Sequence, residues 1–196
     1  MIHLIFATNN DHKTEEVRSA LGSAFTLETM RQAGLDIDIP EPHPTLLENA
    51  LEKARTVARL TGRSAFGEDT GLEVTALQGA PGVLSARYAG EARSAEANMR
   101  KVLLGLEGAA DRSACFRTVM ALVLEGNEFH FEGTCFGHIV DGPRGAQGFG
   151  YDPIFVPDGS TLSFAEMDLE QKNRFSHRKR ALDQLISFLK NTSCPG

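Results

Sequence analysis

The chain has 196 residues, 41% of them hydrophobic, which is enough for one well-packed domain with at most two lobes. It carries 20 Lys and Arg against 26 Asp and Glu, a formal net charge of −6. That balance argues against a protein held on nucleic acid by contacts to the phosphate backbone. It leaves open a nucleotide substrate, which needs only a local basic pocket.

The cysteines and the N-terminal segment indicate the compartment. Cys115, Cys135 and Cys194 have neither the spacing of a metal site nor that of a redox pair. We therefore expect reduced thiols and a cytoplasmic protein. The first apolar run is too short for a signal peptide, and no stretch has the length of a membrane span, so we expect no membrane partner.

Hydrophobic periodicity predicts alternating strands and helices in the first half of the chain. The expected elements are a strand over 2–8, a helix over 14–25, a helix from Thr45 to a stop at Gly62, a strand over 64–68 and a helix over 94–106. Thr45 and Glu48 form a capping box, and Gly62 is typical of a helix C-terminus.

The second half is predicted to be an antiparallel ribbon followed by a helix. The expected elements are strands over 116–124 and 128–140, a glycine-rich loop over 142–150 and a helix over 176–190. Gly126-Asn127 between the strands is typical of a two-residue hairpin turn. This order predicts a mixed α/β fold in a single domain over 1–196.

The first strand ends in a polar segment, Thr8-Asn9-Asn10-Asp11-His12-Lys13, ahead of a helix. Unpaired backbone N–H groups and the helix dipole favour an anion there, and Lys13 adds a charge that suits phosphate. The segment lacks the glycines of a P-loop or dinucleotide fingerprint. Taken alone, an ordinary turn and helix N-cap is therefore the stronger interpretation.

Two carboxylates, Glu68 and Asp69, follow a short strand, at the kind of strand end where α/β proteins bind ligands. Adjacent residues of an extended strand point to opposite faces, so only one of them faces a given pocket. Glu41 lies in a loop that prolines hold extended. Glu41 and Asp69 together suit Mg²⁺, whereas His43 has no second His or Cys at the spacing of a zinc site. The alternatives to a metal site are an acidic turn at Glu68 and Asp69 and an exposed loop charge at Glu41.

Two motifs in the second half suit a nucleobase. Phe149-Gly150-Tyr151-Asp152 combines an aromatic ring, a flexible glycine and a carboxylate, although a core aromatic and a turn would give the same pattern. His177 and Arg178 open the last helix, where the dipole prefers acids, so these cations are easier to understand facing an anion or a carbonyl oxygen. Lys53 and Lys172 lie on predicted helices, where most lysines are solvated.

In their order and spacing, from residue 7 to residue 182, these motifs resemble the inosine triphosphate pyrophosphatase family. The matching segments are Ala7-Thr8-Asn9-Asn10 with Lys13, Glu48-Asn49-Ala50 with Lys53-Ala54, Glu68-Asp69-Thr70-Gly71, Ser85-Ala86-Arg87-Tyr88-Ala89-Gly90, Gly148-Phe149-Gly150-Tyr151-Asp152-Pro153-Ile154-Phe155 and Ser176-His177-Arg178. The resemblance implies an elongated α/β fold, with a mixed sheet flanked by helices and a nucleotide-binding cleft between two lobes. It also implies a homodimeric, Mg²⁺-dependent enzyme that hydrolyses ITP, dITP and XTP to the monophosphate and pyrophosphate.

The resemblance also implies a role for individual residues at the phosphate end. Thr8 to Lys13 would cradle the triphosphate, and Lys53 and Lys172 would add positive charge to it. Glu41 and Asp69 would hold the metal, and Asp69 is also the implied proton acceptor.

At the base end, the family pattern places Phe149 to Asp152 around the nucleobase, with His177 and Arg178 at its six-position. Thr70 would contact the substrate. Glu68 stands where many relatives carry aspartate, and we keep it as a possible second base.

Two alternatives remain. A nucleotide pyrophosphatase of the septum-formation type would prefer other bases, and Ser176-His177-Arg178 disfavours it. A non-catalytic nucleotide-binding module would have no need of Asp69.

Overall fold

The structure is a computed structural model that describes residues 2–21 and 25–192. The chain forms two compact units. Unit 1 consists of Met1–Asp69, Thr118–Gly133 and Arg178–Gly196, and unit 2 of Thr70–Arg117 and Thr134–His177. Cys194 lies outside the described residues, and Cys115 and Cys135 are buried free thiols.

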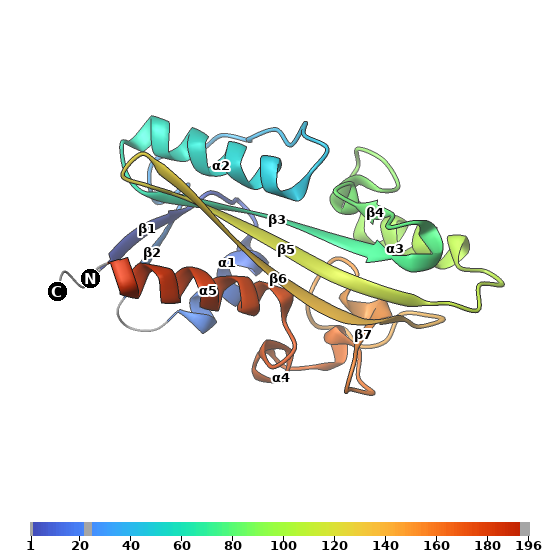
Figure 1. The fold of residues 1–196 in the computed structure, drawn as a ribbon. Helices are drawn as coiled ribbons and strands as arrows, with labels where there is room; N and C mark the ends of the chain where they lie inside the picture. The colour runs from blue at the N-terminus through green and yellow to red at the C-terminus, as the bar shows by residue number, and fades with distance from the viewer. Residues whose placement is uncertain (1, 22–24, 193–196) are drawn as a thin grey trace. The chain divides into compact units, whose positions relative to one another are not determined.

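Helices and strands alternate along the first half of the chain, as predicted (Figure 1). The helices are α1 (Asp11–Ala20), α2 (Leu46–Thr61), α3 (Ala95–Gly105), α4 (Leu169–Asn173) and α5 (His177–Thr192). The strands are β1 (Ile2–Phe6), β2 (Phe25–Thr29), β3 (Ala65–Val74), β4 (Pro81–Gly82), β5 (Ser113–Leu124), β6 (Asn127–Ile139) and β7 (Phe155–Pro157). None of the described helices is both long and apolar enough to cross a membrane.

The strands form a mixed sheet in the order β2-β1-β3-β5-β6-β7, with β4 paired to β3. Strand β1 runs parallel to β2 and β3, whereas β4 is antiparallel to β3 and β7 is antiparallel to β6. The prediction of a mixed α/β fold is therefore confirmed.

In unit 1 the helices cover both faces of the strands, with α2 on one face and α1 and α5 on the other (Figure 1). Successive side chains of β1 point to opposite faces of the sheet, so this strand contributes apolar side chains to both helix layers. Leu4 and Phe6 belong to the apolar cluster that includes residues of α1 and α5, whereas Ile5 packs in the cluster that includes Val57 of α2. Both helix layers are thus held by burial of the same strand.

Helix α2 approaches β3 closely because Gly67 has no side chain. A Cβ at Gly67 would lie 2.2 Å from the carbonyl oxygen of Ala50 and 2.9 Å from the amide nitrogen of Ala54. We expect Gly67→Ala to lower the free energy of unfolding by about 1–3 kcal/mol, since the helix must move away. Urea denaturation measures this, with Gly142→Ala as the control because a Cβ at Gly142 meets nothing within 4 Å. Equal stability of the two variants would contradict the expectation.

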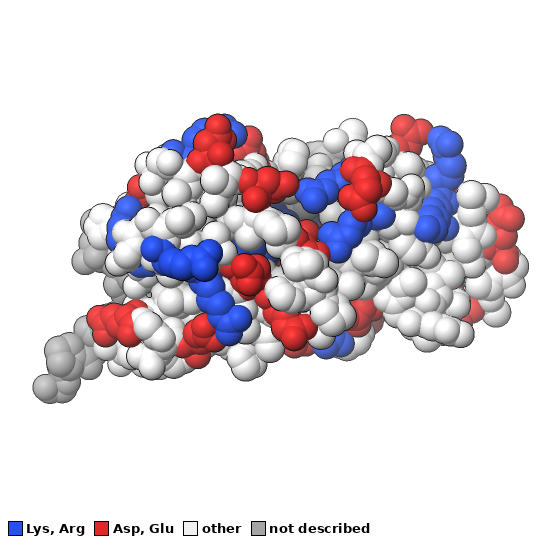
Figure 2. Space-filling model, turned by 90° about the horizontal axis from the view of Figure 1, so that it is seen from above, with Lys and Arg blue, Asp and Glu red and all other residues white. Residues whose placement is uncertain are grey.

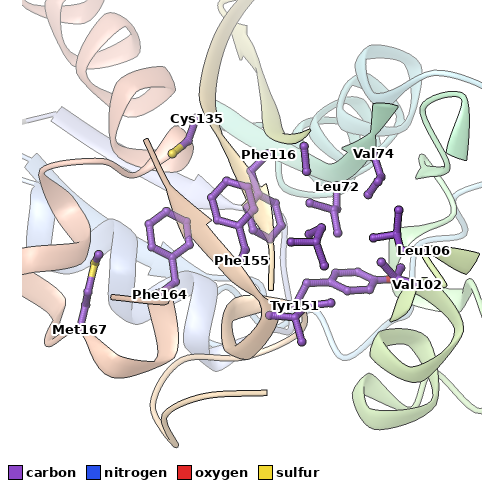
Figure 3. Packing of buried hydrophobic residues seen from close by; sticks show 13 residues of the cluster. Leu72, Val74, Val102, Leu106, Phe116, Cys135, Tyr151, Phe155, Phe164 and Met167 are labelled. Carbon is purple, nitrogen blue, oxygen red and sulfur yellow. The ribbon is translucent and has the colours of Figure 1, made fainter. Parts of the chain in front are cut away.

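The core of unit 2 is aromatic (Figure 3). The ring of Phe155 lies 4.7 Å from that of Phe116 and 5.2 Å from that of Phe164, centroid to centroid. The ring of Tyr151 points along the same cluster toward Val102 and Leu106 of the α3 region (Figure 3). This packing fixes the segment that contains Tyr151 against the rest of unit 2.

Several elements differ from the prediction. Strand β3 continues to Val74 because Leu72 and Glu73 pair with β4, so Glu68 and Asp69 lie within the strand and not at its end, where they were expected. Helix α1 begins at Asp11, not at residue 14, because the Asn10 side chain caps it, and it ends at Ala20. Strand β2 was not predicted, and part of the helix expected over 14–25 lies outside the described residues. The hairpin turn is Glu125-Gly126 instead of Gly126-Asn127, since residues 125 and 126 have positive φ angles of 50° and 82°.

Acidic and basic side chains are interspersed over the face of the molecule seen in Figure 2. This mixture agrees with the modest acidic net charge of −6. It differs from the basic stripe that is typical of a nucleic-acid-binding surface.

Candidate functional site

The polar segment after β1 forms the N-cap of α1. The Asn10 side chain accepts the N–H of Lys13 at 3.1 Å, and the Thr8 hydroxyl accepts the N–H of Asn10 at 3.1 Å. Asn9 donates to the carbonyl oxygen of Ile37 at 2.8 Å. Asp11 and His12 are exposed in the first turn. The N-cap interpretation is thus confirmed. The anion site at the helix start, with Lys13, stays a prediction.

Asp69 lies at the centre of a polar cluster with two residues of α2. Asn49 donates to Asp69 Oδ2 at 3.2 Å, and Lys53 Nζ lies 3.7 Å from Asp69 Oδ1. Lys53 also forms an ion pair with Glu41, so one ammonium contacts two carboxylates. Burial raises the pKa of the Asp69 carboxyl, with Lys53 and Lys13 opposing that rise.

Asn49 also ties the proline-rich loop to α2, and the sequence interpretation gave it no role. The Asn49 side chain accepts the N–H of His43 at 3.0 Å and donates to the carbonyl oxygen of His43 at 3.3 Å. These bonds hold the loop that contains Glu41. The spacing of Asn49 and Lys53 was a usable signal, because residues four apart on a helix lie on the same face and can contact the same group.

Glu68 points to the opposite face of β3, into a second cluster. Arg178 binds it in a bidentate manner, with Nε 2.6 Å from Oε2 and Nη2 3.0 Å from Oε1. Lys13 Nζ lies 2.9 Å from Oε1, and Glu16 forms a further ion pair with Arg178. The contacts of Glu68 and Asp69 confirm that the two carboxylates face different sides.

The charge network changes the acidity of Glu68. Burial alone would raise its pKa, but the charges and hydrogen bonds of Arg178 and Lys13 outweigh burial and hold the pKa well below its usual range. The surroundings thus lower the pKa of Glu68 and raise that of its neighbour Asp69. Glu16, which pairs with Arg178, is a second residue that the sequence interpretation missed, because nothing in its local pattern separates it from a surface glutamate.

A cluster in unit 2 brings together two of the residues expected around the base, Phe149 and Asp152, with Lys172. Asp152 Oδ2 accepts the N–H of Phe149 at 2.9 Å and the ammonium of Lys172 at 2.7 Å. The Lys172 ammonium lies 5.2 Å from the centroid of the Phe149 ring and 5.3 Å from that of Phe164. Gly148 is required beside them, since a Cβ there would lie 2.2 Å from Asp152 Oδ2.

His177 lies on the aromatic core of unit 2. Its imidazole stacks on Phe116 with centroids 4.7 Å apart and lies 6.2 Å from the ring of Phe164, which also contacts Lys172. Thr70 and Gly150 are half-buried. Lys172, expected at the phosphates, contacts two residues that were expected around the base, Asp152 and Phe149.

Comparison with known proteins identifies the family of this chain. The model of the Ham1 family matches residues 4–188. The chain belongs to the Ham1 family. It is 51% identical over 190 residues to a dITP/XTP pyrophosphatase of Porphyromonas gingivalis, covering 96% of this chain and 98% of that protein. It is 46% identical over 189 residues to the dITP/XTP pyrophosphatase of Flavobacterium johnsoniae, with the same coverage of 96% and 98%.

Solved structures of Ham1 proteins share the fold. The Ham1 protein of Staphylococcus aureus has a TM-score of 0.87 at 36% identity, over 97% of this chain and 100% of that one. A Ham1 protein from Coxiella burnetii has a TM-score of 0.88 at 38% identity, over 97% and 100% of the two chains. The family match and the solved structures confirm the resemblance to the inosine triphosphate pyrophosphatases and the fold class that it implied.

Proposed function

We propose that this Ham1-family chain hydrolyses the triphosphates of deaminated purines, ITP, dITP and XTP, to the nucleoside monophosphate and pyrophosphate. The observation that carries the proposal is the identity of 51% to a dITP/XTP pyrophosphatase over 96% of the chain. The lysines and carboxylates of unit 1 supply the chemistry that such a reaction needs. We further propose a single catalytic domain over 1–196 that acts as a cytoplasmic homodimer.

The start of α1 and two lysines form the proposed phosphate site. Phosphoryl transfer depends mainly on positioning and on neutralisation of charge. Lys13 and the backbone N–H groups after Asn10 provide both at the helix start, and Lys53 adds a second ammonium beside Asp69. Thr70, which directly follows Asp69, is the proposed further contact to the substrate.

Glu41 and Asp69 fit a magnesium ion. Both are oxygen ligands, and they already contact a common cation, the ammonium of Lys53. Mg²⁺ uses one or two carboxylates and completes its shell with water and phosphate oxygens. Over residues 2–21 and 25–192, no group of three or more His, Cys, Asp and Glu residues is placed to form an all-protein metal site. A bound ion would neutralise phosphate charge and acidify a water molecule.

Asp69 is the proposed proton acceptor. Burial raises the pKa of Asp69, whereas ion pairs hold the pKa of Glu68 low, and this difference supports Asp69 over Glu68 in the role. Glu68 instead positions Lys13, which it holds at 2.9 Å. The two neighbouring carboxylates thus have separate tasks.

The proposed base site contains Phe149, Asp152 and Lys172, with His177 and Arg178 at the six-position of the purine. Contacts of Lys172 with Phe149 and Asp152 support its assignment to the base end in place of the phosphate end. Hypoxanthine and xanthine carry a keto oxygen at position six, where adenine carries an amino group. Buried donors that face this position are satisfied by the oxygen and mismatched by the amino group.

The decisive experiment compares nucleotides. We expect purified protein with Mg²⁺ to release pyrophosphate from ITP and XTP with a kcat/KM at least about 10²-fold above that for ATP, and we expect EDTA to abolish the activity. Equal rates on all nucleotides would contradict the proposal. Preference for a modified pyrimidine would favour the septum-formation type, and tight binding without turnover would favour a binding module.

A further inference from the structure

The backbone oxygen of Ser85 accepts hydrogen bonds from two buried side chains of unit 2. The Tyr151 hydroxyl donates to it at 2.8 Å, and the Asn98 side chain donates at 3.3 Å. Tyr151 is 66 residues further along the chain than Ser85, and Asn98 is 13 residues further. A single carbonyl therefore joins segments that are distant in sequence.

The side chain of Ser85 extends this junction to strand β3. Its hydroxyl accepts the N–H of Leu72 at 2.8 Å and donates to the carbonyl oxygen of Gly82 at 2.6 Å. Leu72 follows Asp69 by three positions on the same strand. Ser85 is thus bonded at once to β3, to α3 through Asn98, and to the Tyr151 segment.

Asn98 keeps the Ser85 turn rigid. Besides its bond to Ser85, the Asn98 side chain donates to the carbonyl oxygen of Ala86 at 3.1 Å and accepts the N–H of Ala89 at 2.7 Å. Asn98 is only 4% exposed, and its bond to the Ser85 carbonyl is buried. The turn is a firm anchor for any group bonded to it.

Tyr151 lies inside the loop of the proposed base site. Gly148 and Gly150 flank Phe149 with positive φ angles of 73° and 62°. This part of the loop therefore lacks the regular backbone hydrogen bonds of a helix or strand. The Tyr151 ring is packed in the apolar cluster of unit 2 (Figure 3), and its hydroxyl is bonded to Ser85. Burial raises the pKa of the Tyr151 phenol, so it remains a neutral donor.

We propose that Tyr151 is a positioning residue, which fixes Phe149 and Asp152 through its hydrogen bond to Ser85. The proposal rests on the proposed function, in which Phe149 and Asp152 contact the base. Packing of the Tyr151 ring holds the loop against the apolar cluster of unit 2. The bond from the Tyr151 hydroxyl to the Ser85 carbonyl fixes the position of the loop relative to the Ser85 turn. Loss of that bond loosens the base site while the phosphate site of unit 1 keeps its own contacts.

The test is Tyr151→Phe, which keeps the ring and removes the hydroxyl. We expect KM for ITP to rise about 3- to 10-fold with kcat within about twofold of the wild type. We expect affinity for IMP to fall by the same factor and affinity for tripolyphosphate to stay unchanged. Ser113→Ala is the control, since it removes an exposed hydroxyl of unit 2 that donates to Thr75 at 2.7 Å, and we expect it to change none of these values.

A second measurement needs no substrate. The N–H of Phe149 is bonded to Asp152, and we expect it to exchange with deuterium faster in Tyr151→Phe, with amides of β5 unchanged. Wild-type KM together with wild-type exchange in Tyr151→Phe would overturn the proposal. A fall in kcat alone would overturn it too, because the hydroxyl would then act on the reacting atoms. If the wild type did not hydrolyse ITP, the proposed function would fail, while the exchange experiment would still decide whether Tyr151 orders the loop.

Discussion

Asp69→Asn is expected to slow pyrophosphate release from ITP by about 10²- to 10⁴-fold, the range that removal of a proton-transfer group gives. Asparagine keeps the shape of the side chain and an oxygen for the Asn49 amide, which donates to Asp69 at 3.2 Å. It removes the negative charge and the basic oxygen whose pKa is raised by burial. Steady-state kinetics measure the loss, and calorimetric titration with ITP measures binding, which we expect to persist.

Asp183→Asn on the exposed face of α5 is the matched control for this loss. It removes the same charge from an exposed side chain that pairs with its helix neighbour Lys179 at 2.6 Å. We expect the control to have wild-type kinetics. Full activity of Asp69→Asn would remove Asp69 from the mechanism, and equal losses in both variants would show a general effect of net charge.

Arg178→Ala is expected to lower the free energy of unfolding by about 3–5 kcal/mol, because it leaves buried carboxylates without their cation. Glu68 loses two bonds, at 2.6 and 3.0 Å, and Glu16 loses its ion pair. Lys13 remains beside Glu68 at 2.9 Å. Urea denaturation at neutral pH measures the difference.

The control is Arg55→Ala, which breaks another bidentate pair. Arg55 binds Glu128 at 2.6 and 2.7 Å, but its side chain is 51% exposed. We expect a loss of about 0–1 kcal/mol, since solvent screens the pair. Similar losses in the two variants would show that burial of the Arg178 network contributes nothing.

The pH dependence gives the same prediction a second readout. In the wild type the folded pKa of Glu68 is below its ordinary value of 4.5, so the pair stabilises the protein above that pH and is lost as the pH falls through the folded pKa. In Arg178→Ala this contribution is absent. The stability difference between wild type and variant is therefore expected to narrow as the pH drops below 4.5, and a constant difference would contradict the assignment.

Local signals predicted much of the fold. Thr45 and Ser94 cap α2 and α3 with their own side chains, and Gly62 ends α2 in the left-handed conformation, all within a few residues of the helix ends. Strand β2 was missed because its half-buried pattern lacks a clear alternation. The predicted hairpin turn was wrong by one residue because Glu125 adopts a positive φ angle, which is uncommon for glutamate.

The chemistry of the site was harder to predict than its residues. Glu68 and Asp69 were expected on opposite faces, which follows from strand geometry alone. Their protonation behaviour depends on partners that are far away in sequence, such as Asn49 for Asp69 and Arg178 for Glu68. Periodicity carries no information on such pairs, so the separate roles of the two carboxylates required the tertiary structure.

The ion pairs of Arg178 also bear on how the protein folds. Its partners Glu68 and Glu16 are 110 and 162 residues away in the chain. Contacts of such long range close late, because a large loop must be ordered before they form. Before these contacts form, the Glu68 carboxyl is in water and has its ordinary pKa. The proposed phosphate site then reaches its final geometry only in the last folding step, and slow docking of α5 would delay activity more than it delays compaction.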